Sequence, residues 1–405
     1  MEGSSQTGVD VVGMDAHSRK LSLCLMRREG DRIVKLKSVA TTLDALEGTY
    51  MKQMPSGVLT VLEASTNSFI IASRLKAIGF GTKVLCSDVL SGLSRQDRVN
   101  DRIDAENLAR AYLRYGPELR AVFTPTERGM EMREMYFAYR DAKKDMTRMS
   151  NRIWSFCSRH GLDVDKRMSR SRGEGLLRDV RAMGWTAPLA ERAESLVAEW
   201  EHARGRCGTL EKAIERAVFE DERMRRLQQV PGVRSIGAFA LVAFVEDVRR
   251  FDNPKKLVSY IGLNPSVSAS GEKESRRKVS DFGRSDLKSI FVEAAQSAMR
   301  TDCAMTKWAR HLLADGKEWN KVMVALARKL VVLCWHILMG HLTPNREREA
   351  ATARKFVRLA RQVGKELVRA SGYSSADEFA EAECSKLYGH LPEEQAGKVA
   401  VCVSA

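Results

Sequence analysis

The sequence lacks the cysteine arrangements that are typical of metal-binding modules and secreted disulfide domains. Its eight cysteines are scattered along the chain, no two form a CxxC pair, and no histidine is near enough to complete a zinc-ligand spacing. Scattered cysteines of this kind are typical of reduced, mostly buried thiols. We therefore expect a cytoplasmic protein without a zinc site.

Long uninterrupted hydrophobic runs are also missing. The most apolar segment, VMVALARKLVVLCWHILMG, contains Arg328 and Lys329, so it is predicted to be a buried helix and not a membrane span. The N-terminal residues MEGSSQTGVD have no charged region followed by an apolar stretch, which argues against a secretory signal. No internal repeat or low-complexity tract is present. These features predict a soluble, intracellular protein with no membrane partner.

What the sequence does have is length and positive charge. Its 405 residues are enough for two or three domains. The chain carries 67 Lys and Arg against 52 Asp and Glu, a net charge of +15 that is spread along its length. A distributed basic surface favours a polyanionic partner, of which nucleic acid is the commonest. The alternative is a basic enzyme with no such partner.

The first 120 residues predict a mixed α/β domain. Apolar runs and amphipathic segments alternate in the order three strands, helix, strand, helix, strand, helix. The predicted strands are VDVVGMD, KLSLCLMR, RIVKLKSVAT, GVLTVLEA and TKVLC, and the predicted helices are TLDALEGTYMKQM, SFIIASRLKAIG and DAENLARAYLRYG. This order matches a ribonuclease-H-like sheet, in which three antiparallel strands continue into parallel ones.

Four acidic residues lie at the ends of predicted strands or at the start of a predicted helix. Asp15 ends the first strand, Glu63 ends the fourth, and Asp101 and Asp104 open the last helix. Like charges three residues apart on a helix cost roughly 0.2–0.5 kcal/mol, so a positive group between them is expected. Helix capping is the alternative explanation for an acid in a first turn. The functional hypothesis is a pair of Mg²⁺ ions, or Mn²⁺ ions, held by the four acids; Asp97 precedes the helix and is not expected to take part.

Residues 126–225 predict two long amphipathic helices. Apolar residues recur at alternating spacings of three and four, which is the pattern of a coiled-coil seam. The arginine- and glycine-rich stretch KRMSRSRGEG is expected to join the helices, which could pair with each other or across subunits. The first seam is Met132, Met135, Tyr139, Ala142, Met146, Met149, Ile153 and Phe156, and the second is Leu189, Ala193, Leu196, Trp200, Ala203, Cys207, Leu210, Ile214 and Ala217.

A Pro-Gly turn follows in VPGVRSIGAFALVAF. With Gly232 in the turn and Arg234 after it, the segment resembles a helix-hairpin-helix, an element that presents backbone N–H groups to DNA phosphates. A tight corner between two helices explains the same residues equally well.

The next segment, YIGLNPSVSASGEKESRRK, is predicted to be a loop because it is rich in glycine and serine. It ends in the basic residues Arg276, Arg277 and Lys278. A serine hydroxyl beside guanidinium groups is suited to attack a phosphodiester, because the cations stabilise the charge that develops. Composition does not choose among the three serines Ser266, Ser268 and Ser270. The segment beyond 346 is predicted to be one charged helix followed by a polar tail.

Taken in order, the motifs VGMDAH, VLEAST, NDRIDAENLA, VPGV, and YIGLNP followed by ASG resemble those of the DEDD insertion-sequence transposases, which are also described as bridge-RNA-guided serine recombinases. The resemblance spans roughly residues 9–341. It implies a RuvC-like DEDD catalytic domain at 1–125, a coiled-coil oligomerisation region at 126–225, a mainly helical serine domain at 226–345 and a charged helix and tail at 346–405. It also implies that Asp15, Glu63, Asp101 and Asp104 bind Mg²⁺ and that Ser270 is the nucleophile.

The mechanism implied by the resemblance is strand exchange through a serine-linked DNA intermediate. Such enzymes assemble the acids of one subunit with the serine of another, join subunits through the coiled coil, and select donor and target duplexes with a noncoding RNA. Two alternatives stay open: a junction-resolving endonuclease that uses only the acids, and a catalytically inactive DNA-binding descendant.

Overall fold

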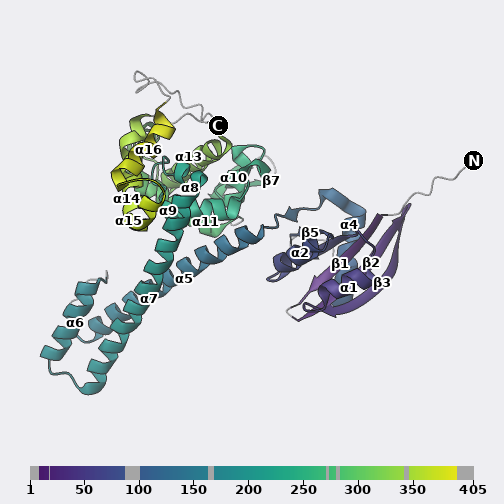
Figure 1. The fold of residues 1–405 in the computed structure, drawn as a ribbon, viewed down its shortest axis with the longest axis horizontal. Helices are drawn as coiled ribbons and strands as arrows, with labels where there is room; N and C mark the ends of the chain where they lie inside the picture. Colours follow the sequence, from purple (N-terminus) through teal and green to yellow (C-terminus); the bar gives the residue numbers. More distant parts are fainter. Residues whose placement is uncertain are drawn as a thin grey trace, which may run out of the picture. The chain divides into compact units, whose positions relative to one another are not determined.

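The computed structural model describes residues 9–17, 19–86, 101–162, 168–270, 273–279, 283–341 and 346–389. Asp97 lies outside these ranges. The chain forms two compact units, residues 1–130 and residues 131–405 (Figure 1). The second unit contains all but the first residues of the first long helix and the segments that follow it.

The first unit is built on a six-stranded mixed sheet with the order β3-β2-β1-β4-β5-β6. β1, β2 and β3 are antiparallel, β1, β4 and β5 run parallel, and β6 is antiparallel to β5. The strands are β1 (Val9–Ala16), β2 (Lys20–Glu29), β3 (Arg32–Thr42), β4 (Leu59–Glu63), β5 (Gly81–Leu85) and β6 (Ala121–Val122), and the helices are α1 (Leu46–Gln53), α2 (Ser68–Ala77), α4 (Asp101–Tyr115) and the 3-10 turn η1 (Gly116–Glu118). The predicted order of strands and helices is confirmed, and the two-residue β6 is an addition.

Both faces of this sheet are covered, because the central strands are apolar on both sides. On β2, Leu23 and Leu25 pack with residues of α1 and α2, whereas Cys24 and Met26 pack with residues of α4. Alternate residues of a strand point to opposite faces, so one strand contributes to two separate cores. Helix α4 is therefore held against the face opposite to α1 and α2.

The second unit begins with an antiparallel pair of long helices, α5 (Glu127–Arg159) and α7 (Ala187–Glu220), with α6 (Arg170–Ala182) at their far end (Figure 1). The two predicted seams meet each other within the chain: Ile153 and Phe156 share a buried cluster with Leu196 and Trp200. An ion pair from Arg206 to Asp145, 2.9 Å long, joins the helices nearer the body of the unit.

The prediction that KRMSRSRGEG only connects these two helices is wrong in part, because helix α6 begins within this stretch. The Ser169 side chain accepts a hydrogen bond from the Arg172 N–H, which caps the helix. Leu176 and Val180 are then buried against α5 and α7. An apolar face downstream thus extends helical structure back into an arginine- and glycine-rich stretch.

The remaining elements form a mainly helical body. They are α8 (Glu222–Leu227), α9 (Ser235–Val245), η2 (Val248–Arg250), α10 (Pro254–Ile261), β7 (Pro265–Ser270), β8 (Lys273–Val279), α11 (Ser285–Ala298), α12 (Ala304–Ala314), α13 (Trp319–Met339), η3 (Arg346–Arg348), α14 (Glu349–Val363), α15 (Lys365–Ala370) and α16 (Ala376–Tyr388). Helix α13 is long and apolar enough to cross a membrane by composition, but it packs against α10, α11 and α12 in the core. The prediction of a buried helix is confirmed.

The segment beyond 346 differs from the expected charged helix and polar tail. A break at Gly364, with φ of +94°, separates α14 from α15, and a third helix, α16, follows. Phe379 and Tyr388 of α16 are buried in the same core as Phe356 of α14. The apolar residues of α16 are spaced to form one buried stripe, which outweighs the polar composition of the segment.

Seven cysteines lie in the described residues and all seven are free thiols, as predicted. Cys402 lies outside the described ranges.

Candidate active site

The sheet register places two of the predicted acids side by side. Met14 of β1 pairs with Leu62 of the parallel strand β4. Asp15 and Glu63 are the next residues, so they lie at the carboxyl ends of neighbouring parallel strands. Ligands bind at this edge in open sheets of this kind because the strand ends leave a crevice there.

Helix α4 brings the third acid to the same place. A side-chain carbon added at Gly13 would lie 1.9 Å from the Ala105 carbonyl oxygen and 2.7 Å from the Ala109 nitrogen. The helix backbone therefore rests directly on β1 two residues before Asp15. Residues two apart on a strand share a face, so Asp15 lies on the face that α4 covers, near its first turn, where Asp104 precedes Ala105.

The electrostatics of Glu63 agree with this placement. Its side chain is partly buried, and its pKa is raised by burial first and then by the negative charges of Asp15 and Asp104. Three predicted acids thus influence one another in space although they come from separate parts of the chain. The backbone of Asp101 begins α4, one helical turn before Ala105, and its side chain lies outside the described atoms.

A residue that sequence reasoning missed contacts this group. The Nε2 atom of His17 lies 3.2 Å from the Oδ2 atom of Asp15, and His17 is largely exposed. The spacing Asp-x-His at the end of a strand could have revealed it, because residues two apart share a face. His17 is thus available to a ligand that approaches Asp15 from solvent.

The donor chemistry of the acids fits a hard divalent cation, since carboxylate oxygens are the ligands that Mg²⁺ and Mn²⁺ prefer. The pKa of Glu63 is raised first by burial and then by the negative charge of Asp15 and Asp104, and a cation would offset that charge. Within the described ranges, however, no three histidine, cysteine, aspartate or glutamate side chains are arranged to hold one metal ion. The acids are gathered but not closed around a common point.

The predicted serine region is a two-stranded hairpin and not the expected loop. β7 carries Ser266, Ser268 and Ser270, and β8 carries Arg276, Arg277 and Lys278. Ser270 pairs with Lys273 at the end of the ladder. Small polar and apolar residues alternate with period two in PSVSAS, which suits a strand, whereas serine and glycine content suggested a loop. The side chains of both strands lie outside the described atoms.

The Pro-Gly turn lies between α8 and α9 and packs closely on α11. Gly232 has a φ of +73°, and a side-chain carbon there would lie 1.9 Å from the Ala294 carbonyl oxygen. Both the turn and the close approach therefore require glycine. Arg234 is exposed beside the turn.

A buried-amine contact from α14 supports the turn. The Nζ atom of Lys355 donates hydrogen bonds to the carbonyl oxygens of Gln228, Val230 and Val233 at 2.6, 2.6 and 2.8 Å. The segment beyond 346 is thus coupled to the turn that was predicted to contact DNA.

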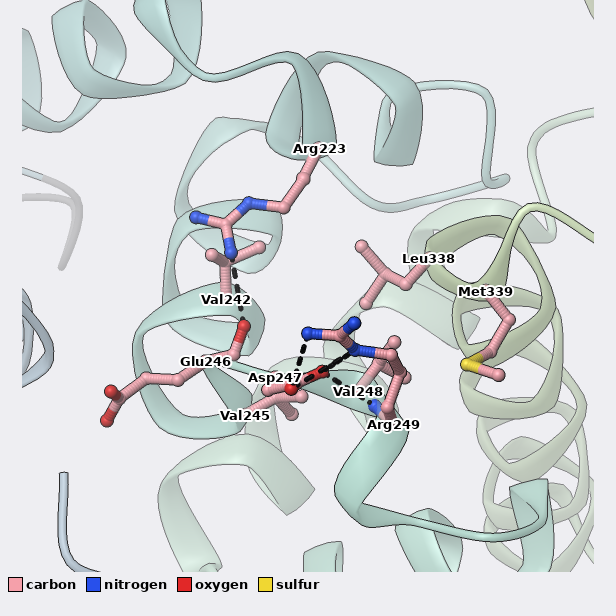
Figure 2. Close-up of a pocket in the computed structure, with 9 residues that line it drawn as sticks. All are labelled: Arg223, Val242, Val245, Glu246, Asp247, Val248, Arg249, Leu338 and Met339. Carbon is pink, nitrogen blue, oxygen red and sulfur yellow. Dashed lines mark hydrogen bonds and ion pairs between the residues drawn. The ribbon is translucent and has the colours of Figure 1, made fainter. Parts of the chain in front are cut away.

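A pocket at the C-terminal end of α9 contains none of the predicted site residues (Figure 2). Arg223 donates to the Glu246 carbonyl oxygen at 3.1 Å, and Arg249 pairs with Asp247 at 2.9 Å. Glu246 adopts a φ of +55°, which is unusual for a residue with a side chain. The two arginines of this pocket bind groups of the loop after α9, so their contacts stabilise that loop.

Comparison with known proteins identifies the family. Residues 224–310 match the model of the "Transposase IS116/IS110/IS902 family", and residues 12–159 match a second model, for the DEDD transposase domain of IS110 elements, which is described as "Transposase". The first match contains the Pro-Gly turn and the β7–β8 hairpin, the second contains the acids, and together they cover more than half of the chain. The chain belongs to the IS110/IS116 transposase family.

Individual relatives of this transposase agree. A "Probable family 20 transposase" of Pseudomonas aeruginosa is 26% identical over 297 residues, 71% of this chain and 86% of the relative. The "Transposase for insertion sequence element IS1111A" of Coxiella burnetii is 26% identical over 59% of this chain and 66% of the relative. The "Transposase for insertion sequence element IS1328" of Yersinia enterocolitica is 19% identical over 81% of this chain and 96% of the relative. The transposase is therefore an enzyme of an insertion sequence.

Proposed function

We propose that this insertion-sequence transposase cleaves and exchanges DNA strands with Asp15, Glu63, Asp101 and Asp104 holding Mg²⁺ or Mn²⁺. The observation that carries the proposal is the gathering of Asp15, Glu63 and Asp104 at one edge of the sheet. All three lie within the residues that match the DEDD model, which supports use of a divalent metal.

The chemistry follows from the residues. When bound, divalent ions of this kind polarise a phosphodiester and neutralise charge on its oxygens. The carboxylates at the ends of β1 and β4 and at the start of α4 would hold these ions beside the phosphate, and they accept protons. Glu63 is suited to proton transfer, because burial and its acidic neighbours raise its pKa.

Ser270 is the proposed nucleophile. Its Oγ atom forms a bond to phosphorus while one bridging P–O bond of the DNA strand breaks. The serine proton is passed through a carboxylate to the deoxyribose oxygen that leaves, so atoms and charge balance. The support is the order of the family motifs and the position of Ser270 at the end of β7, three residues before the basic strand β8 begins.

Assembly and guidance complete the proposal. We propose that the acids of one subunit work with Ser270 of another in a dimer or tetramer, and that a noncoding RNA of the element selects donor and target duplexes. The net charge of +15 supports binding to nucleic acid in general. Co-purification of RNA with the full chain, followed by sequencing, tests guidance.

The Ser270→Ala variant tests the nucleophile. We expect this change to abolish protein–DNA adducts that survive denaturation, and to abolish recombination, because no other hydroxyl would form the linkage. The measurement is denaturing gel electrophoresis with end-labelled donor and target duplexes. Ser268→Ala, two residues earlier on the same strand, is the matched control and should retain adducts.

The rival function is a junction-resolving endonuclease that uses only the acids, and the DEDD match favours it as the second candidate. In that case Ser270→Ala would leave cleavage largely intact while Asp104→Asn would abolish it. If neither variant changed the biological effect of the protein, the third hypothesis, an inactive DNA-binding descendant, would replace both.

A further inference from the structure

A broad groove in the second unit combines three segments that lie far apart in the sequence. It is lined by α5, by the Pro-Gly turn with the start of α9, and by α11 with the residues that follow it, and its volume is about 790 Å³. The groove contains Gly232 and Arg234, which were predicted to contact nucleic acid, but most of its residues were not singled out by any motif.

The groove is strongly basic. Among the described residues that line it, Glu293 is the sole acid. The basic side chains are Arg140, Lys143, Lys144 and Arg148 from α5, Arg234 from the turn and Arg300 after α11. Such an excess of one sign in a concave surface concentrates the field and favours a polyanion.

Three of these six basic side chains form ion pairs with carboxylates of the protein, and the other three form none in the described part of the chain. Arg140 pairs with Asp286 at 2.9 Å and Arg148 with Asp145 at 2.9 Å, while Lys144 lies 3.9 Å from Asp141. Lys143, Arg234 and Arg300 are exposed, and none of them forms an ion pair with a carboxylate in the described part of the chain. Like charges left facing one groove repel one another unless an anion lies between them.

The other lining groups suit a phosphate backbone. Thr147, Asn151, Ser289 and Ser297 contribute hydroxyl and amide groups to the groove. Side chains of these types, with lysine and arginine, make most protein contacts to DNA phosphates. From residue 140 to residue 148 of α5 the axial rise is about 12 Å, which equals the rise of about three to four nucleotides of a duplex strand.

We propose that this groove binds the phosphate backbone of the duplex DNA on which the transposase acts. The inference rests on the proposed function, because it takes DNA as the substrate. Helix α11 begins six residues after β8 ends, so the groove adjoins, along the chain, the hairpin that carries Ser270. A duplex held there would lie on the same unit that carries the proposed nucleophile.

The test is a triple variant, Lys143→Ala with Arg234→Ala and Arg300→Ala, in the full chain. Binding to a 30-base-pair DNA duplex is measured by fluorescence anisotropy between 50 and 200 mM salt, without divalent metal. We expect affinity to fall by roughly 10- to 100-fold for every duplex sequence, and the slope of log K against log salt to fall by about 2.7, which is 0.9 for each lost phosphate contact.

A matched control removes the same charge elsewhere. Arg354, Arg361 and Arg369 are exposed on α14 and α15, and their triple alanine variant should bind the duplex within about twofold of the parent. Equal losses in the two triple variants would overturn the proposal, because net charge alone would then explain the binding. Thermal melting of both variants checks that they are folded.

An A-form RNA duplex of the same sequence forms the second arm. Loss of RNA binding with DNA binding unchanged would assign the groove to RNA and overturn the proposal. If the parent protein does not bind the DNA duplex at all, the proposed function itself fails. If the parent binds and the groove variant binds equally well, only the groove assignment fails.

Discussion

At the scale of single residues, the absence of a side chain decides where the acids meet. Gly13 is the point at which α4 touches β1, and no larger residue fits between the two backbones. The same contact sets the distance from Asp104 to Asp15. A substitution at a position with no chemistry of its own should therefore disturb the acidic site.

We predict that Gly13→Ala lowers the free energy of unfolding of the first unit by about 1–3 kcal/mol and weakens Mg²⁺ binding, since the added carbon forces α4 away from the sheet. Urea denaturation and isothermal calorimetry measure the two effects. Gly48→Ala, in α1 where a side-chain carbon meets nothing within 4 Å, is the control and should stabilise by roughly 0.5–1 kcal/mol. Unchanged stability in Gly13→Ala would refute the packing argument.

At the scale of elements, one lysine of the C-terminal helices donates hydrogen bonds to the backbone around the Pro-Gly turn. Lys355 of α14 satisfies three carbonyl groups between α8 and α9. A buried carbonyl group without a hydrogen-bond donor costs about 1–3 kcal/mol of stability. The single amine of Lys355 reduces this cost at each carbonyl group that it contacts. These helices thus stabilise the wall of the basic groove, although they lie beyond the matched residues 224–310.

We predict that Lys355→Met destabilises the second unit by about 2 kcal/mol and increases hydrogen exchange at the turn. The carbonyl groups of Gln228 and Val233 lose the Lys355 donor, and that of Val230 keeps one donor, the Val233 N–H, in place of two. Hydrogen exchange detected by mass spectrometry gives the location of the change. Lys365→Met removes an exposed lysine at the start of α15 and should be neutral. Protection of the turn in Lys355→Met equal to that of the parent would contradict this coupling.

The elements also show what the sequence can and cannot predict. The β1 and β4 strands were predictable because each is a short apolar run that ends in an acid, and the acids at Asp15 and Glu63 were found in this way. The β7–β8 hairpin differs from the predicted loop because its serine and glycine content is typical of a loop, whereas its period of two favours a strand. Helix α16 was missed because its buried residues are separated by charged ones.

The groove was missed for a different reason. Lys143, Arg234 and Arg300 are ordinary surface residues in the sequence, and only the packing of α5, the turn and α11 brings them together. Such a site depends on long-range contacts between segments, which local composition does not encode.

At the scale of the whole molecule, the division into two units separates the acids from the serine. Residues 1–130 contain Asp15, Glu63 and Asp104, while residues 131–405 contain Ser270 and the basic groove. Each unit has its own buried core. The two parts of the proposed chemistry therefore depend on separately stabilised bodies.

We predict two unfolding transitions in calorimetry, of which Mg²⁺ raises only the one that belongs to the first unit. At 100 times its dissociation constant, a ligand adds about 2.7 kcal/mol to the stability of the body that binds it. Asp104→Asn should remove the shift, and Asp44→Asn, an exposed acid in the same unit, should preserve it. A shift of both transitions, or a shift that survives in Asp104→Asn, would contradict the assignment of the metal site.

The chain passes from one unit to the other a single time, between residues 130 and 131, within the first turns of α5. A genetic crossover at this point between two related insertion sequences would exchange an intact acidic half for another without cutting through either core. The architecture thus allows new elements to arise by reassortment of halves, with each half free to diverge at its own pace.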